Sequence, residues 1–421
     1  MIDRPEYIKK LLGFKDKQLI KIITGVRRCG KSTLFEIYQT ELAKLGVVSD
    51  QILSINLEDP AYRDLMNWEK LYDYIDSRLL SDKKNYIFID EIQNVKDFEK
   101  AADGLFIKKN VDLYLTGSNS KVQSGEWATL LSGRYVEIHM LPLSFKEYAS
   151  TFPHSVRPDE IYSYYLSYSS FPYTVSMLKM NEDFMQHDGN GSSGAAEKAN
   201  LKKTGQQIYD YLNGIYSTIV LKDVAENKKI KEVGRLERII KFMADIIGSE
   251  TSIKRISDML TSDGMKVMPL TVESYLDALR DCYILYRADR YDVKGRKLLK
   301  TQNKYYMVDM GLRRFLLGSK PVNSGHVLEN VVYLELIRRG YKVYIGKVGA
   351  KEVDFVAEGF DGTEYYQVSE TVLGRETLTR ELAPLEAIRD HNPKFLLTRD
   401  YDPQTSHNGI KQLNVLEWLL R

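Results

Sequence analysis

The stretch GVRRCGKST, residues 25–33, joins a glycine-containing loop to a lysine and two hydroxyl residues, directly after an apolar strand-like run. Glycines let backbone amides turn toward one anion, and a helix opening after the loop adds its positive N-terminal end. Lys31 would then reach the β- and γ-phosphates, and Ser32 would coordinate Mg²⁺. The pattern predicts an ATP site built from Gly25, Val26, Arg27, Arg28, Cys29, Gly30, Lys31, Ser32 and Thr33.

A second motif, YIFIDEIQ (86–93), is an apolar strand that ends in two carboxylates. Asp90 is expected to hold the Mg²⁺ shell, and Glu91 is expected to polarise the attacking water. Asn56 closes another strand-like run and could restrain Glu91, although a simple turn residue is the preferred interpretation. The two motifs together predict Mg²⁺-dependent hydrolysis of ATP.

Three further positions could assist the reaction. Asn119, or Ser118, in LTGSNS (115–120) is placed to hold the lytic water or to sense the γ-phosphate, and a helix N-cap is the alternative. Arg134 in SGRY (132–135) is a candidate arginine finger for the γ-phosphate of a neighbouring subunit, which would require a homo-oligomer. Arg27 and Arg28 could instead supply positive charge within the same chain.

The elements that must position these residues alternate between strands and helices over the first ~145 residues, as in a parallel sheet of βαβ units. The strand candidates are 18–25, 52–58, 86–91 and 111–117, and their continuous apolar runs indicate strands covered on both faces. The segment 187–200 is small and polar, which predicts a flexible loop or linker.

From residue 205 the pattern is helical again, with amphipathic helices at 252–260 and 270–279 and alternating strands over 283–309. Two helices, a turn and a basic hairpin are the layout of a winged helix. The candidate DNA contacts on the hairpin are Arg287, Arg290, Lys294, Arg296, Lys297 and Lys300. The alternative is a solvated hairpin, and the acidic helix 271–281 favours backbone contacts over base readout if DNA binds.

Composition limits the remaining possibilities. The chain has 421 residues and a net charge of +2, but residues 221–320 hold 21 Lys and Arg against 14 Asp and Glu. Residues 325–421 hold 12 against 15, so the positive field belongs to the middle of the chain. Two cysteines, no secretory pattern at the start and no apolar run of about 20 residues predict a cytoplasmic protein without a membrane span.

Together these motifs resemble the prokaryotic AAA-type ATPases that carry a C-terminal region of unknown function. The matching stretches, which span nearly the whole chain, are TGVRRCGKSTL (24–34), FIDEIQ (88–93), LTGSNS (115–120), LSGRYVEIHMLPLSFKEY (131–148), YSTIVLKDV (216–224), KYYMVDMGLRR (304–314), GHVLENVVYLELIRRGYKV (325–343) and EVDFV (352–356). The resemblance implies an α/β P-loop core sheet of the ASCE type, a winged-helix region and a fold like PD-(D/E)xK nucleases. The family often has Gly-Gly before Phe-Pro, where this chain has Ser169 and Ser170.

The nuclease-like region lacks part of the motif that the resemblance implies. Glu329 and Asp354 match two acidic positions, but the acid-x-Lys of the second strand reads Gln367-Val368-Ser369. Glu352 and Glu370 are expected to point to the wrong face or to lie off the motif. A nuclease needs its acids for Mg²⁺ and its lysine for the nucleophile, so we interpret this site as degenerate.

The predicted organisation has four parts: an ATPase domain (1–150), a helical bridge (151–204), a helical and winged-helix domain (205–320) and a nuclease-like domain (321–421). The predicted function is an ATPase that couples hydrolysis to conformational change, with DNA handling as one output. The alternatives are a nucleotide-controlled switch that binds a protein partner, and an ATP-dependent nuclease.

Overall fold

The computed structural model describes residues 1–117, 131, 133–180, 195–226, 230, 232–318, 323–401 and 405–421. The chain divides into two compact units, Met1–Pro142 and Leu143–Arg421. Among the described residues, no helix combines the length and the apolar content that crossing a membrane requires. The boundaries predicted at residues 204 and 320 both fall inside the second unit.

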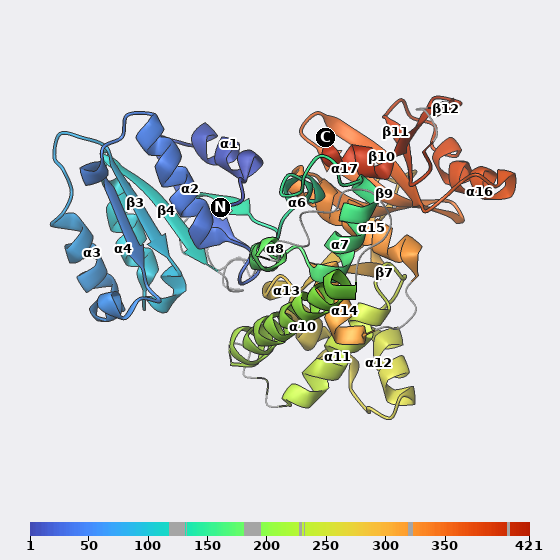
Figure 1. Ribbon diagram of the computed structural model, residues 1–421, viewed down its shortest axis with the longest axis horizontal. Coiled ribbons are helices and arrows are strands. Elements are labelled where there is room, and N and C mark those ends of the chain that lie inside the picture. Colours follow the sequence, from blue (N-terminus) through green and yellow to red (C-terminus); the bar gives the residue numbers. More distant parts are fainter. Residues whose placement is uncertain are drawn as a thin grey trace. The chain divides into compact units, whose positions relative to one another are not determined.

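The first unit contains a five-stranded sheet in the order β2-β3-β4-β1-β5, in which every neighbouring pair is parallel. Helices α1 and α2 lie on one face of this sheet, and α3 and α4 lie on the other (Figure 1). The predicted parallel sheet of a P-loop fold is confirmed. The bounds are α1 (Pro5–Gly13), β1 (Ile20–Thr24), α2 (Lys31–Lys44), β2 (Ile52–Asn56), α3 (Trp68–Asp76), β3 (Asn85–Asp90), α4 (Phe98–Ile107), β4 (Val111–Gly117) and β5 (Tyr135–His139).

The strand order brings the chemical groups of the first unit together. The apolar residues of β1, β3 and β4 are buried because helices cover both faces, so only the strand ends can carry accessible polar groups. Strand β4 pairs with β3 on one side and with β1 on the other. The carboxyl ends of these three strands therefore lie side by side, where Thr24, Asp90 and Gly117 end them.

The second unit begins with helices. They are α6 (Phe145–Ala149), α7 (Pro158–Tyr168), α8 (Pro172–Lys179), α10 (Ala195–Thr218) with a π-helical continuation (Ile219–Glu226), α11 (Val233–Asp245), α12 (Ile253–Ser262) and α13 (Pro269–Asp281). Helix α10 starts inside the predicted loop 187–200, so residues 195–200 are helical rather than loop. Ala, Glu and Lys in AAEKAN favour a helix, which outweighs their small or polar character. Residues 187–194 lie outside the described residues.

An eight-stranded sheet forms the rest of the second unit, in the order β12-β13-β11-β10-β9-β8-β6-β7. The basic hairpin is its β6-β7 edge, and β6 pairs with β8 in parallel, so one sheet crosses the boundary predicted at residue 320. The strands of this sheet and the helices between and after them are β6 (Leu285–Asp292), β7 (Lys297–Met307), α14 (Met310–Leu317), α15 (Ser324–Arg338), β8 (Lys342–Val348), β9 (Lys351–Gly359), β10 (Gly362–Ser369), α16 (Arg375–Glu386), β11 (Lys394–Thr398), β12 (Thr405–His407), β13 (Ile410–Asn414) and α17 (Val415–Leu420).

A close contact between α14 and the end of α7 fixes part of the second unit. Ser169 has φ of +77° and ψ of 153°, a backbone region that residues other than glycine rarely occupy. Ser170 donates from its backbone N–H and its hydroxyl to Asp309 Oδ2, at 2.7 and 2.6 Å. A Cβ on Gly311 would lie 2.3 Å from the backbone nitrogen of Ser169. The glycine is therefore required for this approach.

We expect Gly311→Ala to lower the free energy of unfolding by about 1–3 kcal/mol, because the added methyl group forces the backbone of Ser169 to move. Gly214→Ala, in α10, is the matched control, since a Cβ there meets no atom within 4 Å. The control should stabilise its helix by roughly 0.5–1 kcal/mol. Thermal unfolding followed by circular dichroism measures both changes, and equal shifts in the two variants would contradict the close contact.

Candidate functional site

The loop between β1 and α2 has a backbone that depends on glycine at two positions. Gly25 has φ of +148°, and a Cβ there would lie 2.1 Å from the carbonyl oxygen of Met140. Gly30 precedes α2 in the left-handed conformation, with φ of +104°. Both conformations turn the chain sharply before the helix begins. The residues predicted to surround a phosphate group are thus held in one tight loop at the N-terminus of α2.

Arg4 supports this loop from the start of the chain, a role that no sequence pattern indicated. Its guanidinium donates from Nη1 to the carbonyl of Cys29 at 3.2 Å and from Nη2 to the carbonyl of Leu141 at 2.7 Å. The side chain is almost fully buried and lies over the ring of Tyr7. Tyr7 in turn accepts a hydrogen bond from the Leu141 amide. The loop is therefore tied to the residues that leave β5.

Lys31, predicted to bind phosphate, is buried within the loop. Its Nζ donates to the carbonyl oxygens of Gly25 at 3.1 Å and of Val26 at 3.4 Å. The ammonium is thus kept next to the loop and is within reach of any anion held there. Of the two loop arginines, Arg27 pairs with Glu58 at 3.2 Å, and Arg28 is exposed with φ of +68°.

Asp90 is brought together with Ser32, as the sequence predicted. Ser32 donates from Oγ to Asp90 Oδ2 at 2.5 Å, and Thr116 donates to Oδ1 of the same carboxylate. Burial raises the pKa of Asp90, and the two hydroxyl hydrogen bonds lower it in part. A hydroxyl beside a carboxylate is a set of hard oxygen donors, which fits Mg²⁺. Thr116 was missed, although its position as the polar end of the strand beside β3 could have identified it.

Glu91 follows Asp90 in a left-handed conformation, with φ of 56° and ψ of 49°. Its backbone N–H donates to Thr116 Oγ1 at 2.9 Å, and its carboxylate accepts from the side-chain amide of Gln93. Asn56 accepts from the backbone N–H two residues ahead of it, as a turn residue does. Gln93 thus restrains the Glu91 carboxylate, and Asn56 serves as a turn residue.

Arg134 lies at the amino ends of β1 and β5, whereas the loop lies at the carboxyl end of β1. It precedes β5, whose first residue pairs with Ile20 at the start of β1, while the loop follows Thr24 at the end of β1. Four residues of strand separate these ends by about 13 Å. Arg134 pairs with Asp103 at 3.0 Å, and its side chain is 43% exposed. Asn119 and Ser118, the other candidates, lie outside the described residues.

A second cluster of charged residues occupies the predicted nuclease-like region. Lys304 on β7 is buried, and its Nζ lies 2.9 Å from Glu329 Oε1 and 2.8 Å from Glu352 Oε1. Tyr306 donates its hydroxyl to the same Glu329 oxygen at 2.6 Å. Burial lowers the pKa of Lys304, but the carboxylates of Glu329, Asp354 and Glu352 outweigh it and raise the pKa above the usual value. Lys304 is thus a permanent cation among carboxylates.

Glu352 was predicted to point to the wrong face or to lie off the motif, and the first of these two alternatives is wrong. Residues two apart on a strand share a face, so Glu352 lies on the same side of β9 as Asp354, and the pair with Lys304 follows. Glu370 does lie elsewhere, 3.5 Å from Arg399.

Asp354 and Gln367 are brought together on the paired strands β9 and β10. Asp354 Oδ2 accepts from the amide of Val368 at 2.8 Å, and burial, with the nearby Glu329, raises the pKa of Asp354 well above its usual value. Gln367 donates its amide to Glu381 at 2.9 Å. Within the described ranges, no group of three His, Cys, Asp or Glu side chains is arranged to hold a metal ion. At this position Lys304 already lies against Glu329 and Glu352 as their counter-charge.

Fewer cations of the basic hairpin are available to contact DNA than its sequence indicated. Arg290 is 9% exposed, pairs with Glu250 at 2.7 Å and donates to Gln302, so it cannot serve as the predicted DNA contact. The sequence could not reveal its partner, which lies 40 positions away on another segment. Arg287 is exposed but pairs with Asp289 at 2.8 Å.

The cations around the hairpin turn remain exposed. They are Lys294, Arg296 and Lys297. The side chain of Lys300 lies outside the described residues. Burial and the neighbouring Glu352 raise the pKa of Glu250, the partner of Arg290, to about 7.

Comparison with known proteins agrees with the geometry of the first unit. Residues 17–149 match the AAA domain family, and residues 196–323 match a domain of unknown function (DUF8612). An uncharacterized protein of Haemophilus influenzae is 38% identical over 425 residues, covering 100% of this chain and 99% of that protein. The uncharacterized protein MJ1544 of Methanocaldococcus jannaschii is 29% identical over 377 residues, covering 86% and 78%.

Among solved structures, the Walker-type ATPase of Pyrococcus abyssi is 18% identical, with a TM-score of 0.49, covering 75% of this chain and 96% of that one. The AAA match covers the loop, Asp90 and Glu91, and the Haemophilus influenzae protein matches from end to end. The chain therefore belongs to the family of that Haemophilus influenzae protein, and its N-terminal unit is a P-loop domain of the AAA ATPase type.

Proposed function

We propose that this protein hydrolyses ATP in a Mg²⁺-dependent reaction and uses the reaction to change its conformation. The observation that carries the proposal is the buried Asp90 carboxylate, which accepts hydrogen bonds from Ser32 and Thr116 with Glu91 next in sequence. A carboxylate buried beside hydroxyl groups, at the N-terminus of a helix that follows a glycine loop, is suited to a metal-bound phosphate.

The side chains have separate roles in this reaction. Lys31 exchanges the carbonyl oxygens of Gly25 and Val26 for phosphate oxygens. Mg²⁺, when bound by Ser32 and Asp90, would offset the charge of the phosphates. Glu91 accepts the proton of the attacking water, and it must first leave the amide of Gln93 that holds its carboxylate.

Arg134 acts on the nucleotide of a second subunit in this proposal. It lies at the amino ends of the strands, and the loop lies at their carboxyl ends, so Arg134 does not reach the nucleotide of its own chain. The pair with Asp103 is exposed, and such pairs contribute only about 0–1 kcal/mol, so Arg134 can exchange partners at little cost. A finger in this position requires a homo-oligomer.

The second unit supplies the output, which we propose to be nucleic-acid handling. Helices α11, α12 and α13 precede the β6-β7 hairpin, and Thr251 forms a β-bridge with Asn303 of β7. This order supports a winged-helix interpretation. The exposed cations at the hairpin turn then suit phosphate contacts, whereas Glu273 and Asp277 on α13 disfavour base readout. A nucleotide-controlled switch that binds a protein partner is the alternative.

The charged cluster around Lys304 is structural in this proposal. The ammonium neutralises Glu329 and Glu352 from within the chain, in the region where a nuclease of this fold would hold its metal. The PD-(D/E)xK-like region is then a scaffold and not a working nuclease.

Glu91→Gln should retain ATP binding and lower turnover by a factor of about 10²–10⁴, because the amide cannot accept the proton from water. Lys31→Ala should lose both ATP binding and turnover. Removal of Mg²⁺ with a chelator should abolish turnover by the wild-type protein. Steady-state phosphate release and nucleotide binding by fluorescence measure these effects. Glu69→Gln, at an exposed position of α3, is the control and should match the wild type. Full turnover by Glu91→Gln would remove Glu91 from the mechanism.

Addition of DNA should raise the steady-state turnover, and the increase should disappear as salt is raised, because phosphate contacts depend on counterion release. Arg296→Glu combined with Lys297→Glu should reduce the increase without changing the basal rate. If turnover is the same with and without single-stranded and duplex DNA, the output is not nucleic acid. A pull-down with the Glu91→Gln protein, loaded with ATP, would then test the protein-partner alternative.

Lys304→Met should lower the free energy of unfolding by about 3–5 kcal/mol, because it removes the ammonium that neutralises the buried Glu329 and the half-buried Glu352. Lys294→Met, at an exposed position near the hairpin turn, should change it by less than about 0.5 kcal/mol. Urea denaturation compares the two variants. A wild-type protein that cuts plasmid DNA with Mg²⁺ or Mn²⁺, and loses this activity in Asp354→Asn, would contradict the structural role.

A further inference from the structure

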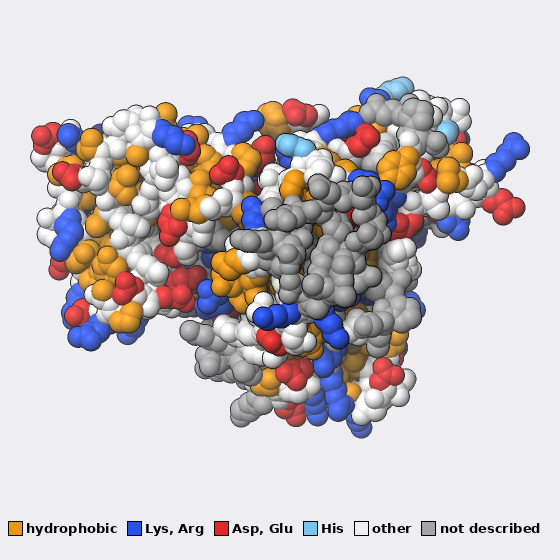
Figure 2. Space-filling view, in the orientation of Figure 1, with side chains coloured by type: hydrophobic (Ala, Val, Ile, Leu, Met, Phe, Trp, Pro, Cys, Tyr) orange, Lys and Arg blue, Asp and Glu red, His pale blue; other side chains and the backbone are white. Residues whose placement is uncertain are grey.

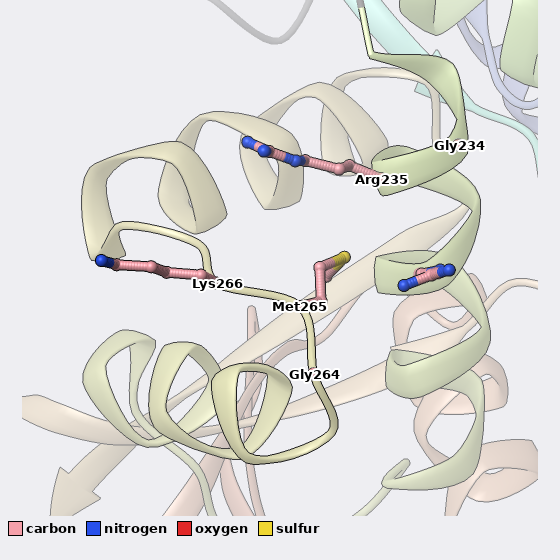
Figure 3. A pocket seen from close by; sticks show the side chains of 6 residues that line it. Gly234, Arg235, Gly264, Met265 and Lys266 are labelled. Atoms are coloured by element: carbon pink, nitrogen blue, oxygen red, sulfur yellow. The ribbon is translucent and has the colours of Figure 1, made fainter.

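A basic cavity lies between α11 and the turn that joins α12 to α13. Its volume is about 410 Å³, and its lining residues are Gly234, Arg235, Arg238, Gly264, Met265 and Lys266. Arg235 lies on one side of the cavity, and Lys266 and the side chain of Met265 lie on the other (Figure 3). A Cβ on Gly234 or Gly264 would meet no atom within 4 Å, so the mouth of the cavity is open at both glycines.

A second cavity, of about 520 Å³, continues from the first and shares Arg238 and Met265 with it. The two form a groove along α11. The second cavity is lined by both apolar and charged residues. The apolar lining is Phe242, Leu260, Met265, Leu316 and Leu317, and the charged lining is Arg238, Lys241, Asp245 and Asp263.

The cations of the groove are free to bind an anion. Arg235, Arg238 and Lys241 are exposed and lie three residues apart, so they share one face of α11 at intervals of about 4.5 Å. Figure 2 shows Lys and Arg side chains gathered over α11. Arg235 pairs with Glu232, but both side chains are about half exposed, and such a pair is weak. Within the part of the chain that the structure describes, no ion pair involves Arg238, Lys241 or Lys266.

We infer that this groove binds single-stranded nucleic acid, with the cations on the phosphates and the apolar floor against sugars and bases. A row of cations follows a chain of phosphates better than a single phosphate, since the groove is longer than one such group. A duplex keeps its bases inside, so it would leave the apolar floor uncovered. The groove is separate from the hairpin turn and does not depend on the P-loop.

Binding is measured as the fluorescence anisotropy of a labelled 20-nucleotide single strand, added to the full chain without ATP. The test variant is Arg238→Glu with Lys266→Glu, which should weaken binding by about ten- to a hundredfold and reduce the salt dependence of the affinity. The control is Arg375→Glu with Lys411→Glu, which changes the net charge equally at exposed positions on α16 and β13. The control should bind within twofold of the wild type. Arg296→Glu with Lys297→Glu changes the hairpin turn and leaves the groove intact, so its affinity for the strand shows how much of the binding depends on the hairpin.

Three results would overturn the inference. They are binding by the test variant within twofold of the wild type, equal affinity for the duplex of the same sequence, and Arg238-dependent binding of inorganic phosphate without binding of the strand. Basal ATP hydrolysis and the thermal unfolding midpoint of the test variant should equal those of the wild type. If the variant fails to fold, Arg238→Gln with Lys266→Gln repeats the measurement with a smaller change, and wild-type affinity in that protein overturns the inference as well.

Discussion

In the proposed reaction, the first unit depends on keeping the carboxylate of Asp90 buried and still able to bind a cation. Burial alone favours the protonated acid, and the raised pKa records that tendency. Hydrogen bonds from Ser32 and Thr116 favour the ionised form and place its two oxygens. These hydroxyls come from the start of α2 and the end of β4, so the carboxylate is correctly placed only if three segments keep their register. The parallel pairing of β3 with β4 and of β4 with β1 maintains this register.

The second unit meets the same constraint with a different solution. Glu329 and Asp354 are also buried carboxylates, with the half-buried Glu352 beside them, but an ammonium from their own chain lies among them. A site that must accept a metal ion has to leave its charge partly uncompensated, as Asp90 does. A site that already holds its counter-charge gains little from a metal ion. This difference, more than the missing motif residues, is the physical reason why we propose catalysis in the first unit and not in the second.

Local patterns predicted what local interactions determine. The glycine loop, the strand that ends in Asp90 and the amphipathic helices α12 and α13 all follow from neighbouring residues, and all are present. Contacts between distant segments were not predictable in this way. Arg4 reaches the loop across 25 positions, and Lys304 reaches Glu329 across the same separation. Glu352 is a different case, because it lies two residues from Asp354 on β9, so the period of the strand alone places the two side chains on one face.

The charge of the second unit shows why a local excess of cations cannot be assigned to a surface from the sequence. The excess in residues 221–320 suggested a basic hairpin. Arg290 and Lys304 of that hairpin instead neutralise buried or half-buried carboxylates, because β6 and β7 belong to the sheet that holds Glu352. Charge used in this way contributes nothing to an external field. Exposed cations that remain for a polyanion include those around the hairpin turn and those on α11, where the helix period places three of them on one face. The surface best suited to a phosphate chain thus lies on a helix that the sequence pattern did not single out.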